Sequence, residues 1–215
     1  MAFDVAGTLY VCPELDRLVD DQAFVALARA RDWTLDEART ALQEQRAKNR
    51  VDRGDNSKVG ALEALGVPGA TFQDAAAEID PSALLAGAPP IGPLFAKLRS
   101  AGLRVGILSN FKKALVDRIF DALSVEWRQI DASICVDDGL PIKPSPIPFQ
   151  ALCARLGVPA TEALFVGDSL SKDLAPAKRL GMTTVLVEGG KPDGDPADAD
   201  HRLASVLGID ALLGL

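Results

Sequence analysis

The chain has 215 residues and a net charge of −7, because 30 acidic residues outnumber 23 basic ones, and 48% of its residues are hydrophobic. This length suffices for one sizeable core, or for a core with a smaller inserted lobe, and the composition is typical of a soluble globular protein. The acidic balance argues against nucleic acid or an anionic membrane surface as a partner. The net negative charge is compatible with a small-molecule anionic substrate, because a metal ion and a few local hydrogen-bond donors outweigh the electrostatic field of the whole chain. We expect a monomer or a homodimer.

No stretch of the sequence approaches the roughly 20 apolar residues that cross a bilayer, and no basic-then-apolar signal segment precedes the first strand. We therefore expect a cytoplasmic protein. Its three cysteines, Cys12, Cys135 and Cys153, show no metal-ligand spacing, and its single histidine, His201, has no adjacent Cys or Ser partner. Chemistry based on histidine or on a cysteine–metal centre is a poor candidate for this chain.

The chain opens with a very short strand that is followed by a run of helices. Residues 1–5 predict the strand, with only three residues ahead of Asp4. Residues from about 20 to 88 carry helix signals: Thr34 and Glu37 form a capping box, Gly66 ends a short helix, and Thr71 starts another. Because this segment contains no convincing strand, we predict a helical lobe over residues 13–88, with residues 1–12 and 89–215 forming the other domain.

The remaining chain alternates helices with short apolar strands. Helices are predicted over residues 93–100, 111–123, 149–156 and 173–180, and strands over residues 103–108, 132–136, 164–166 and 184–187. Pro176 fits its helix if it lies in the first turn, where amides lack partners. Short apolar strands separated by helices predict an α/β fold with a doubly wound parallel sheet covered on both faces. Residues 188–200, rich in Gly, Pro and Asp, predict an exposed loop before a final helix.

Polar residues stand where four of the predicted strands end: Asp4, Ser109, the segment from Val136 to Asp138, and Asp168. Any one of them alone is explained more simply as a turn former or a helix cap. In an open parallel sheet, however, ligands bind beyond the carboxyl ends of the strands. Four such ends that converge on one edge of the sheet therefore predict a site at that edge.

The candidate site is rich in carboxylates. Asp4, Asp168 and Asp173 would repel one another and raise each other's pKa unless a cation lay between them. Oxygen ligands suit Mg²⁺, which we predict as the cofactor. Lys143, in the sequence Pro141-Ile142-Lys143-Pro144, adds a positive charge on a backbone that the flanking prolines restrict.

Four motifs follow one another along the chain: Phe3-Asp4-Val5-Ala6-Gly7-Thr8-Leu9, Leu108-Ser109-Asn110, Lys143-Pro144-Ser145-Pro146, and Gly167-Asp168-Ser169 with Asp173. In this order and in these strand contexts, they resemble the signature motifs of the haloacid dehalogenase superfamily of hydrolases. The resemblance covers essentially the whole chain. It implies a Rossmann-like core with an inserted all-helical cap, which opens and closes over the active site and restricts it to small molecules.

The resemblance also implies a role for each motif residue. Asp4 would be the nucleophile that attacks phosphorus, and Lys143 would neutralise charge on the nucleophile and on the transferring group. The implied phosphate-binding set is Ser109 and Lys143 with Gly7, Thr8 and Asn110. The implied Mg²⁺ ligands are Asp4, the backbone carbonyl of Ala6, Asp168 and Asp173. We expect the side chains of residues 4, 109, 143 and 168 to gather around one divalent ion and one anion.

Position 6 departs from the pattern of this family. Ala6 stands where the family usually has a second Asp, which protonates the leaving oxygen and then activates water. A positioned acid–base group supplies about 10²–10⁴-fold in rate, so its absence slows the chemistry without necessarily abolishing metal or phosphate binding. We predict a Mg²⁺-dependent hydrolase that acts on a small phosphate monoester through an aspartyl phosphate, with reduced acid–base assistance.

Three alternatives stay open. A hydrolase that resembles the phosphonoacetaldehyde branch also has Ala at this position and needs a cap lysine for a Schiff base, for which Lys48 and Lys58 are candidates in polar surroundings. An enzyme that resembles the 2-haloacid dehalogenase branch lacks the second Asp too, but needs no metal. A non-catalytic binding protein would keep the same scaffold without turnover.

Overall fold

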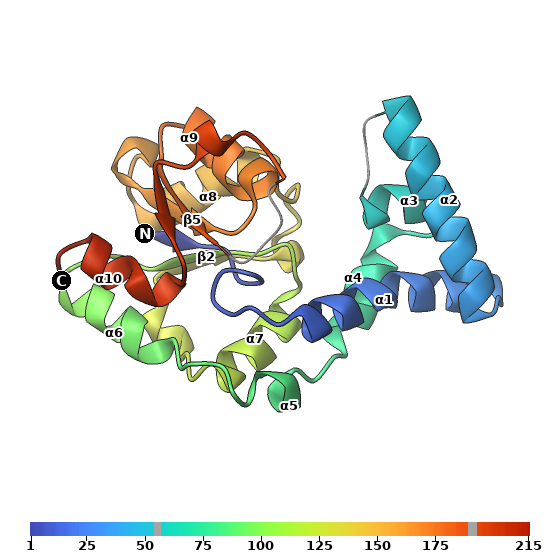
Figure 1. The fold of residues 1–215 in the computed structure, drawn as a ribbon, viewed down its shortest axis with the longest axis horizontal. Helices are drawn as coiled ribbons and strands as arrows, with labels where there is room; N and C mark the ends of the chain where they lie inside the picture. The colour runs from blue at the N-terminus through green and yellow to red at the C-terminus, as the bar shows by residue number, and fades with distance from the viewer. Residues whose placement is uncertain (54–56, 189–192) are drawn as a thin grey trace. The chain divides into compact units, whose positions relative to one another are not determined.

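In the computed structural model, which describes residues 1–53, 57–188 and 193–215, six parallel strands form one sheet (Figure 1). The strands are β1 (Ala2–Phe3), β2 (Gly106–Leu108), β3 (Ala132–Ile134), β4 (Leu164–Gly167), β5 (Thr183–Val187) and β6 (His201–Leu203). Their order across the sheet is β3-β2-β1-β4-β5-β6, so the direction of winding reverses at β1. The predicted doubly wound, Rossmann-like α/β fold is confirmed.

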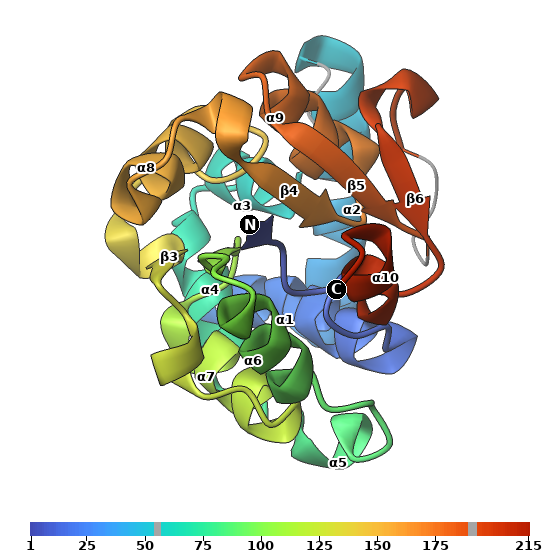
Figure 2. The ribbon, with the colours of Figure 1, turned by 90° about the vertical axis from the view of Figure 1, so that its left-hand side faces the viewer.

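Helices cover both faces of this sheet. One face carries α8 (Ile147–Leu156) and α9 (Ala175–Arg179), and the other carries α6 (Gly92–Ser100), α7 (Lys113–Ala122) and α10 (Ile209–Leu212) (Figure 1, Figure 2). Phe165 of β4 contacts Phe149 of α8, with ring centroids 4.9 Å apart. Phe3 of β1 contacts Phe95 of α6 on the opposite face, at 5.1 Å. Burial on both faces explains why the central strands β1, β2 and β4 are continuously apolar.

The chain divides into two compact units, Met1–Cys12 with Pro81–Leu215, and Pro13–Asp80. The second unit contains α1 (Pro13–Arg31), α2 (Leu35–Arg53), α3 (Lys58–Ala64) and α4 (Gly69–Ala77), and α1 packs against each of the other three. The capping box at the start of α2 forms as predicted, since the Glu37 carboxylate accepts hydrogen bonds from the N–H and the hydroxyl of Thr34, both at 2.8 Å. No described helix has both the length and the apolar composition that crossing a membrane requires.

The division at Asp80 precedes the boundary that the turn-rich sequence predicts at residue 88. The intervening residues contain α5 (Ser82–Leu85), which packs against α7 and so belongs to the unit that contains the sheet. The helix predicted over residues 173–180 begins as a π-helical turn, Leu170–Leu174, and continues as α9 with Pro176 in its first turn.

The residue pattern of this segment predicts no strand where β6 forms. β6 pairs with β5 although its sequence, His201-Arg202-Leu203, has no apolar run. Asp200 holds it in place, because its carboxylate accepts hydrogen bonds from the N–H and the hydroxyl of Thr184 at 2.9 and 2.8 Å. A short, polar edge strand of this kind depends on a contact with its neighbour, which periodicity along the chain does not reveal.

Candidate active site

Asp4 follows β1 at the centre of the sheet, where the strand order reverses. Its backbone N–H donates to the carbonyl of Val166 on β4 at 2.9 Å, which continues the parallel pairing into the turn. Its side chain is buried, with Oδ1 accepting a hydrogen bond from the Lys143 ammonium at 2.5 Å and Oδ2 accepting one from the Thr8 hydroxyl at 3.2 Å. The carboxylate is therefore fixed in orientation by a contact at each oxygen.

Lys143 places its ammonium between two carboxylates. Its Nζ atom lies 2.5 Å from Oδ1 of Asp4 and 2.7 Å from Oδ1 of Asp173, and its side chain is only 4% exposed. Burial lowers the pKa of Lys143, but the charges of Asp173 and Asp4 outweigh burial, and the net pKa lies well above its ordinary value. Lys143 is therefore a permanent positive charge at this edge of the sheet.

Asp4, Asp168 and Asp173 form an acidic cluster, in which one carboxylate oxygen of each lies within 4.8 Å of the others. Burial raises the pKa of Asp4 to about 6, although the charge of Lys143 opposes the shift. Burial, followed by the charges of Asp4 and Asp173, raises the pKa of Asp168 to about 8. Three carboxylates against one ammonium leave an excess of negative charge, and this set of oxygen donors fits a hard divalent cation such as Mg²⁺.

Two glycines allow the backbone to pass close to these carboxylates. Gly7 has a φ of +77°, and a Cβ atom built there would overlap the carboxylate of Asp168. Gly167 ends β4, and a Cβ atom there would lie 2.5 Å from the Cβ of Asp173. A side chain at either position would displace one member of the acidic cluster. Ala6, in the same turn as Gly7, is partly exposed and contributes only a methyl group.

Ser109 and Asn110 follow β2, the strand next to β1. The N–H of Ser109 donates to the carbonyl of Ile134 at 3.0 Å, and its buried hydroxyl oxygen accepts a hydrogen bond from the N–H of Phe111 at 3.1 Å. The Asn110 side chain contacts the backbone of Lys143: Nδ2 donates to the carbonyl at 3.0 Å, and Oδ1 accepts from the N–H at 2.9 Å. These contacts connect the end of β2 to the segment that carries Lys143.

The segment from Val136 to Asp138, the remaining polar strand end of the sequence analysis, lies outside the acidic cluster of the described residues. Asp137 accepts a hydrogen bond from the backbone N–H of Lys113 at 2.5 Å. Asp138 forms an ion pair with Arg155 at 2.7 Å. Both carboxylates hold neighbouring helices in place, which is the ordinary role of a turn or a cap.

Asp193 lies near the cluster, although no motif of the sequence predicts it there. Its Oδ2 accepts hydrogen bonds from the hydroxyls of Ser169 and Ser171 at 2.5 and 2.7 Å. Because Ser169 directly follows Asp168, Asp193 connects the segment after β5 to the acidic cluster. Asp193 and Ser169 are 24 residues apart, and the Asp-rich composition of the loop is the signal that points to such a contact.

A family model described as haloacid dehalogenase-like hydrolase matches residues 1–181 of the chain. This range contains the four motifs and the whole acidic cluster. The chain belongs to the haloacid dehalogenase-like hydrolase family.

Relatives of this haloacid dehalogenase-like chain include dehalogenases and phosphatases. It is similar to (S)-2-haloacid dehalogenase 4A of Burkholderia cepacia, with 32% identity over 60% of this chain and 56% of that protein. It is similar to phosphoglycolate phosphatase of Pseudomonas putida, with 28% identity over 98% of this chain and 77% of that protein. A solved HAD phosphatase from Thermococcus onnurineus has a TM-score of 0.67 at 26% identity, over 99% of this chain and 96% of that one. The chain spans about half the length of several curated relatives that it matches.

Two lysines of this haloacid dehalogenase-like chain are candidates for a Schiff base. Lys58 forms an ion pair with Asp20, and Lys48 is exposed on α2. An amine nucleophile needs a desolvated setting, whereas one of these lysines faces a carboxylate and the other faces water. Their surroundings therefore give no support to an enzyme of the phosphonoacetaldehyde type.

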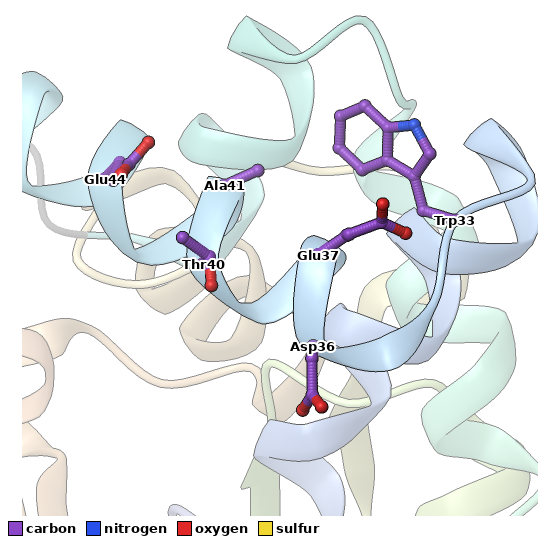
Figure 3. Close-up of a pocket in the computed structure, with 6 residues that line it drawn as sticks. All are labelled: Trp33, Asp36, Glu37, Thr40, Ala41 and Glu44. Carbon is purple, nitrogen blue, oxygen red and sulfur yellow. The ribbon is translucent and has the colours of Figure 1, made fainter.

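A separate pocket of about 560 Å³ lies along α2. It is lined by the side chains that Figure 3 labels, Trp33, Asp36, Glu37, Thr40, Ala41 and Glu44. None of these residues belongs to the four motifs. The Glu37 carboxylate already accepts hydrogen bonds from Thr34 in the capping box, and the Asp36 side chain points away from the Trp33 ring. The lining has three carboxylates and no basic side chain, so this pocket does not suit an anionic substrate.

Proposed function

We propose that this chain is a Mg²⁺-dependent hydrolase that cleaves a small phosphate monoester through an aspartyl phosphate on Asp4. The observation that carries the proposal is the Lys143 ammonium, which lies 2.5 Å from Asp4 and 2.7 Å from Asp173 beside the carboxylate of Asp168. The excess of buried negative charge would repel an anionic substrate, so a divalent cation is needed before a phosphate approaches. The similarity to a phosphatase over nearly the whole chain supports the same reaction.

In this proposal Asp4 is the nucleophile. One of its carboxylate oxygens attacks phosphorus, the bond from phosphorus to the ester oxygen breaks, and Asp4 carries the phosphoryl group. Water then attacks phosphorus, which releases orthophosphate and regenerates the carboxylate. Lys143 offsets negative charge on the transferring group, Thr8 keeps the Asp4 carboxylate oriented, and Ser109 binds a phosphoryl oxygen. The leaving oxygen takes its proton from solvent, because Ala6 has none to give.

We assign Asp4, Asp168 and the backbone carbonyl of Ala6 as the residues that would hold Mg²⁺. When bound, the metal supplies a Lewis acid that stabilises negative charge on the transferring phosphoryl group. Asp173 was predicted as a further ligand, but both of its oxygens accept hydrogen bonds, from Lys143 at 2.7 Å and from the Ser169 N–H at 3.2 Å. Asp4 also accepts a hydrogen bond at each oxygen, so these bonds do not rule out Asp173 as a ligand, and we propose that Asp173 holds Lys143 as well.

The helical unit, Pro13–Asp80, serves in this proposal as the cap of the enzyme. It is inserted between the first and the second motif, which is the position of the cap in the family that the sequence resembles. In the family that the sequence resembles, a cap restricts the active site to small molecules. The proposed substrate is therefore a small phosphate monoester rather than a phosphorylated macromolecule.

A dehalogenase activity is the second candidate. It is favoured by the similarity to a 2-haloacid dehalogenase over 60% of the chain and by Ala6, since the dehalogenase branch lacks the second Asp. In that reaction a carboxylate oxygen of Asp4 would displace halide from carbon without a metal. The three clustered carboxylates weigh against it, because without a cation they repel the carboxylate of a haloacid.

A panel of substrates separates these candidates. We expect p-nitrophenyl phosphate to be hydrolysed in Mg²⁺ and not in EDTA, and alkyl phosphates to react far more slowly, because their leaving oxygen needs a proton. Ala6→Asp should raise kcat on alkyl phosphates by about 10²–10⁴-fold and change the aryl substrate much less. Asp4→Asn, which is isosteric but has no nucleophilic carboxylate, is the matched inactive control.

Equal wild-type rates on aryl and alkyl esters would contradict this account of position 6. Chloride release from a 2-haloacid in the presence of EDTA would support the dehalogenase instead. No turnover of any substrate, together with no beryllium fluoride adduct on Asp4 in Mg²⁺, would indicate a non-catalytic binding protein and end the proposal.

A further inference from the structure

The segment that carries Lys143 has no regular structure to hold it. Residues 139–146 run between a short helical turn after β3 and the start of α8, and they form neither helix nor strand. Three prolines, Pro141, Pro144 and Pro146, have no N–H to donate, so a regular ladder cannot connect this segment to the sheet. Lys143 nevertheless reaches two separate carboxylates at 2.5 and 2.7 Å. Something outside the segment must therefore set the position of its backbone.

Asn110 provides that contact. Its side-chain amide pairs with both backbone polar groups of Lys143, donating to the carbonyl at 3.0 Å and accepting from the N–H at 2.9 Å. These two bonds take the place of those that a neighbouring strand would make. Asn110 is itself well placed, because the preceding Ser109 continues the pairing of β2 with β3 through its N–H bond to Ile134 at 3.0 Å.

We propose that Asn110 is a positioning residue, whose side chain holds the Lys143 ammonium against Asp4 and Asp173. This inference rests on the proposed function, because it assigns Lys143 a part in phosphoryl transfer. Asparagine suits the task, since a short side chain that both donates and accepts in one plane matches the N–H and the carbonyl of one residue. The family resemblance implies that Asn110 binds phosphate. Because the side-chain amide has a second N–H, direct contact of Asn110 with phosphate is the alternative that the experiments must exclude.

Chemical labelling tests the positioning without relying on any activity. An amine-acetylating reagent should modify Lys97, whose side chain is 49% exposed, and spare Lys143, whose side chain is 4% exposed. We expect Asn110→Ala to raise the labelling rate of Lys143 at least ten-fold, measured by peptide mass spectrometry, with Lys97 unchanged. Thr184→Ala is the matched control, because it also removes one donated and one accepted hydrogen bond of a buried side chain, but between β5 and the residues before β6.

Measurements of kcat test whether the position of the Lys143 ammonium contributes to catalysis. Asn110→Ala should lower kcat on p-nitrophenyl phosphate by about 10–100-fold, since a displacement of about 1 Å at a catalytic group costs up to this much. The substitution should leave the inhibition constant of orthophosphate unchanged once Lys143, itself a proposed phosphate contact, has been replaced by Met. In a Lys143→Met background the same substitution should reduce the residual kcat no further, because it acts through the lysine. Asn110→Asp keeps the acceptor for the Lys143 N–H and loses the donor, so its effect should be intermediate.

The proposal is wrong if Lys143 is labelled as slowly in Asn110→Ala as in the wild type. A loss of kcat that persists in the Lys143→Met background, with weaker inhibition by orthophosphate, would assign Asn110 to phosphate instead. If the wild type hydrolyses no phosphate ester, the proposed function fails, and the labelling rates still decide whether Asn110 holds Lys143. Should Asn110→Ala not fold, the isosteric Asn110→Asp provides the same labelling comparison.

Discussion

Lys143→Met removes the positive charge that the acidic cluster encloses. Methionine has nearly the length of lysine, so the apolar stem of the side chain is kept while the ammonium is lost. The carboxylates of Asp4 and Asp173 then face each other and Asp168 in a buried setting without the ammonium that contacts two of them at 2.5 and 2.7 Å. We expect the folded state to lose stability because these charges are left without compensation.

The burial of the pair sets the size of this loss. Removing one partner of a buried ion pair costs about 3–5 kcal/mol, and Lys143 is 4% exposed beside partners that are 10% and 2% exposed. For a chain of this length 1 kcal/mol corresponds to about 2–4 °C, so Tm should fall by ~6–20 °C. Without Lys143 the pKa of Asp4 rises further above its ordinary value. The deficit should therefore shrink as the pH falls and Asp4 takes up a proton.

Lys97→Met is the matched control for this experiment. Lys97 pairs with Asp210 at 2.6 Å, almost the same distance, but the two side chains are 49% and 26% exposed. An exposed pair of this kind is worth less than about 1 kcal/mol. Thermal and urea unfolding of the wild type and both variants, in EDTA at about pH 7.5 and pH 5, measure the comparison. The reasoning would be refuted if the two variants lost the same stability at the higher pH, or if the loss for Lys143→Met did not depend on pH.

Three further predictions concern the turn, the cluster and the edge strand. Gly7→Ala should weaken Mg²⁺ binding, because the new methyl group overlaps the carboxylate of Asp168 and the left-handed φ costs an L-residue about 1–2 kcal/mol. Calorimetry measures the Kd of Mg²⁺, and an unchanged Kd would contradict this prediction. The pKa values of Asp4 and Asp168, raised from 3.8 to about 6 and about 8, mean that the folded apoprotein holds protons that the unfolded chain has lost. Its Tm should therefore fall as the pH rises from about 4 to 8, and the increase in Tm that Mg²⁺ produces should grow over the same range. Asp168→Asn should reduce both pH dependences. An increase in Tm with Mg²⁺ that does not depend on pH would argue against the metal site. Asp200→Ala leaves Thr184 without its carboxylate partner. In hydrogen exchange measured by mass spectrometry, the amides of β6 should exchange faster in this variant, and those of β4 should be unchanged. Equal exchange of β6 in wild type and variant would show that another contact holds the edge strand.

Local patterns along the chain predicted most of the fold. Short apolar runs that end in Asp4, Ser109 and Asp168 were sufficient to place three strands and the edge to which their ends point. These features depend on a few consecutive residues, whose propensities and turn chemistry act over one element. β6 was not predicted, because its pairing depends on the contact between Thr184 and Asp200, which are 16 positions apart.

The sequence by itself determined the order of the motifs, the α/β class and the chemical character of the site, since each of these depends on residue types and on local periodicity. Only the tertiary structure decided that Lys143 lies between Asp4 and Asp173, from which it is separated by 139 and 30 positions. It also decided that the Asn110 amide contacts the backbone of Lys143, 33 positions away. Such pairs form because parallel strands from distant parts of the chain end at one edge of the sheet, and no property of the residues next to them encodes which partners meet there.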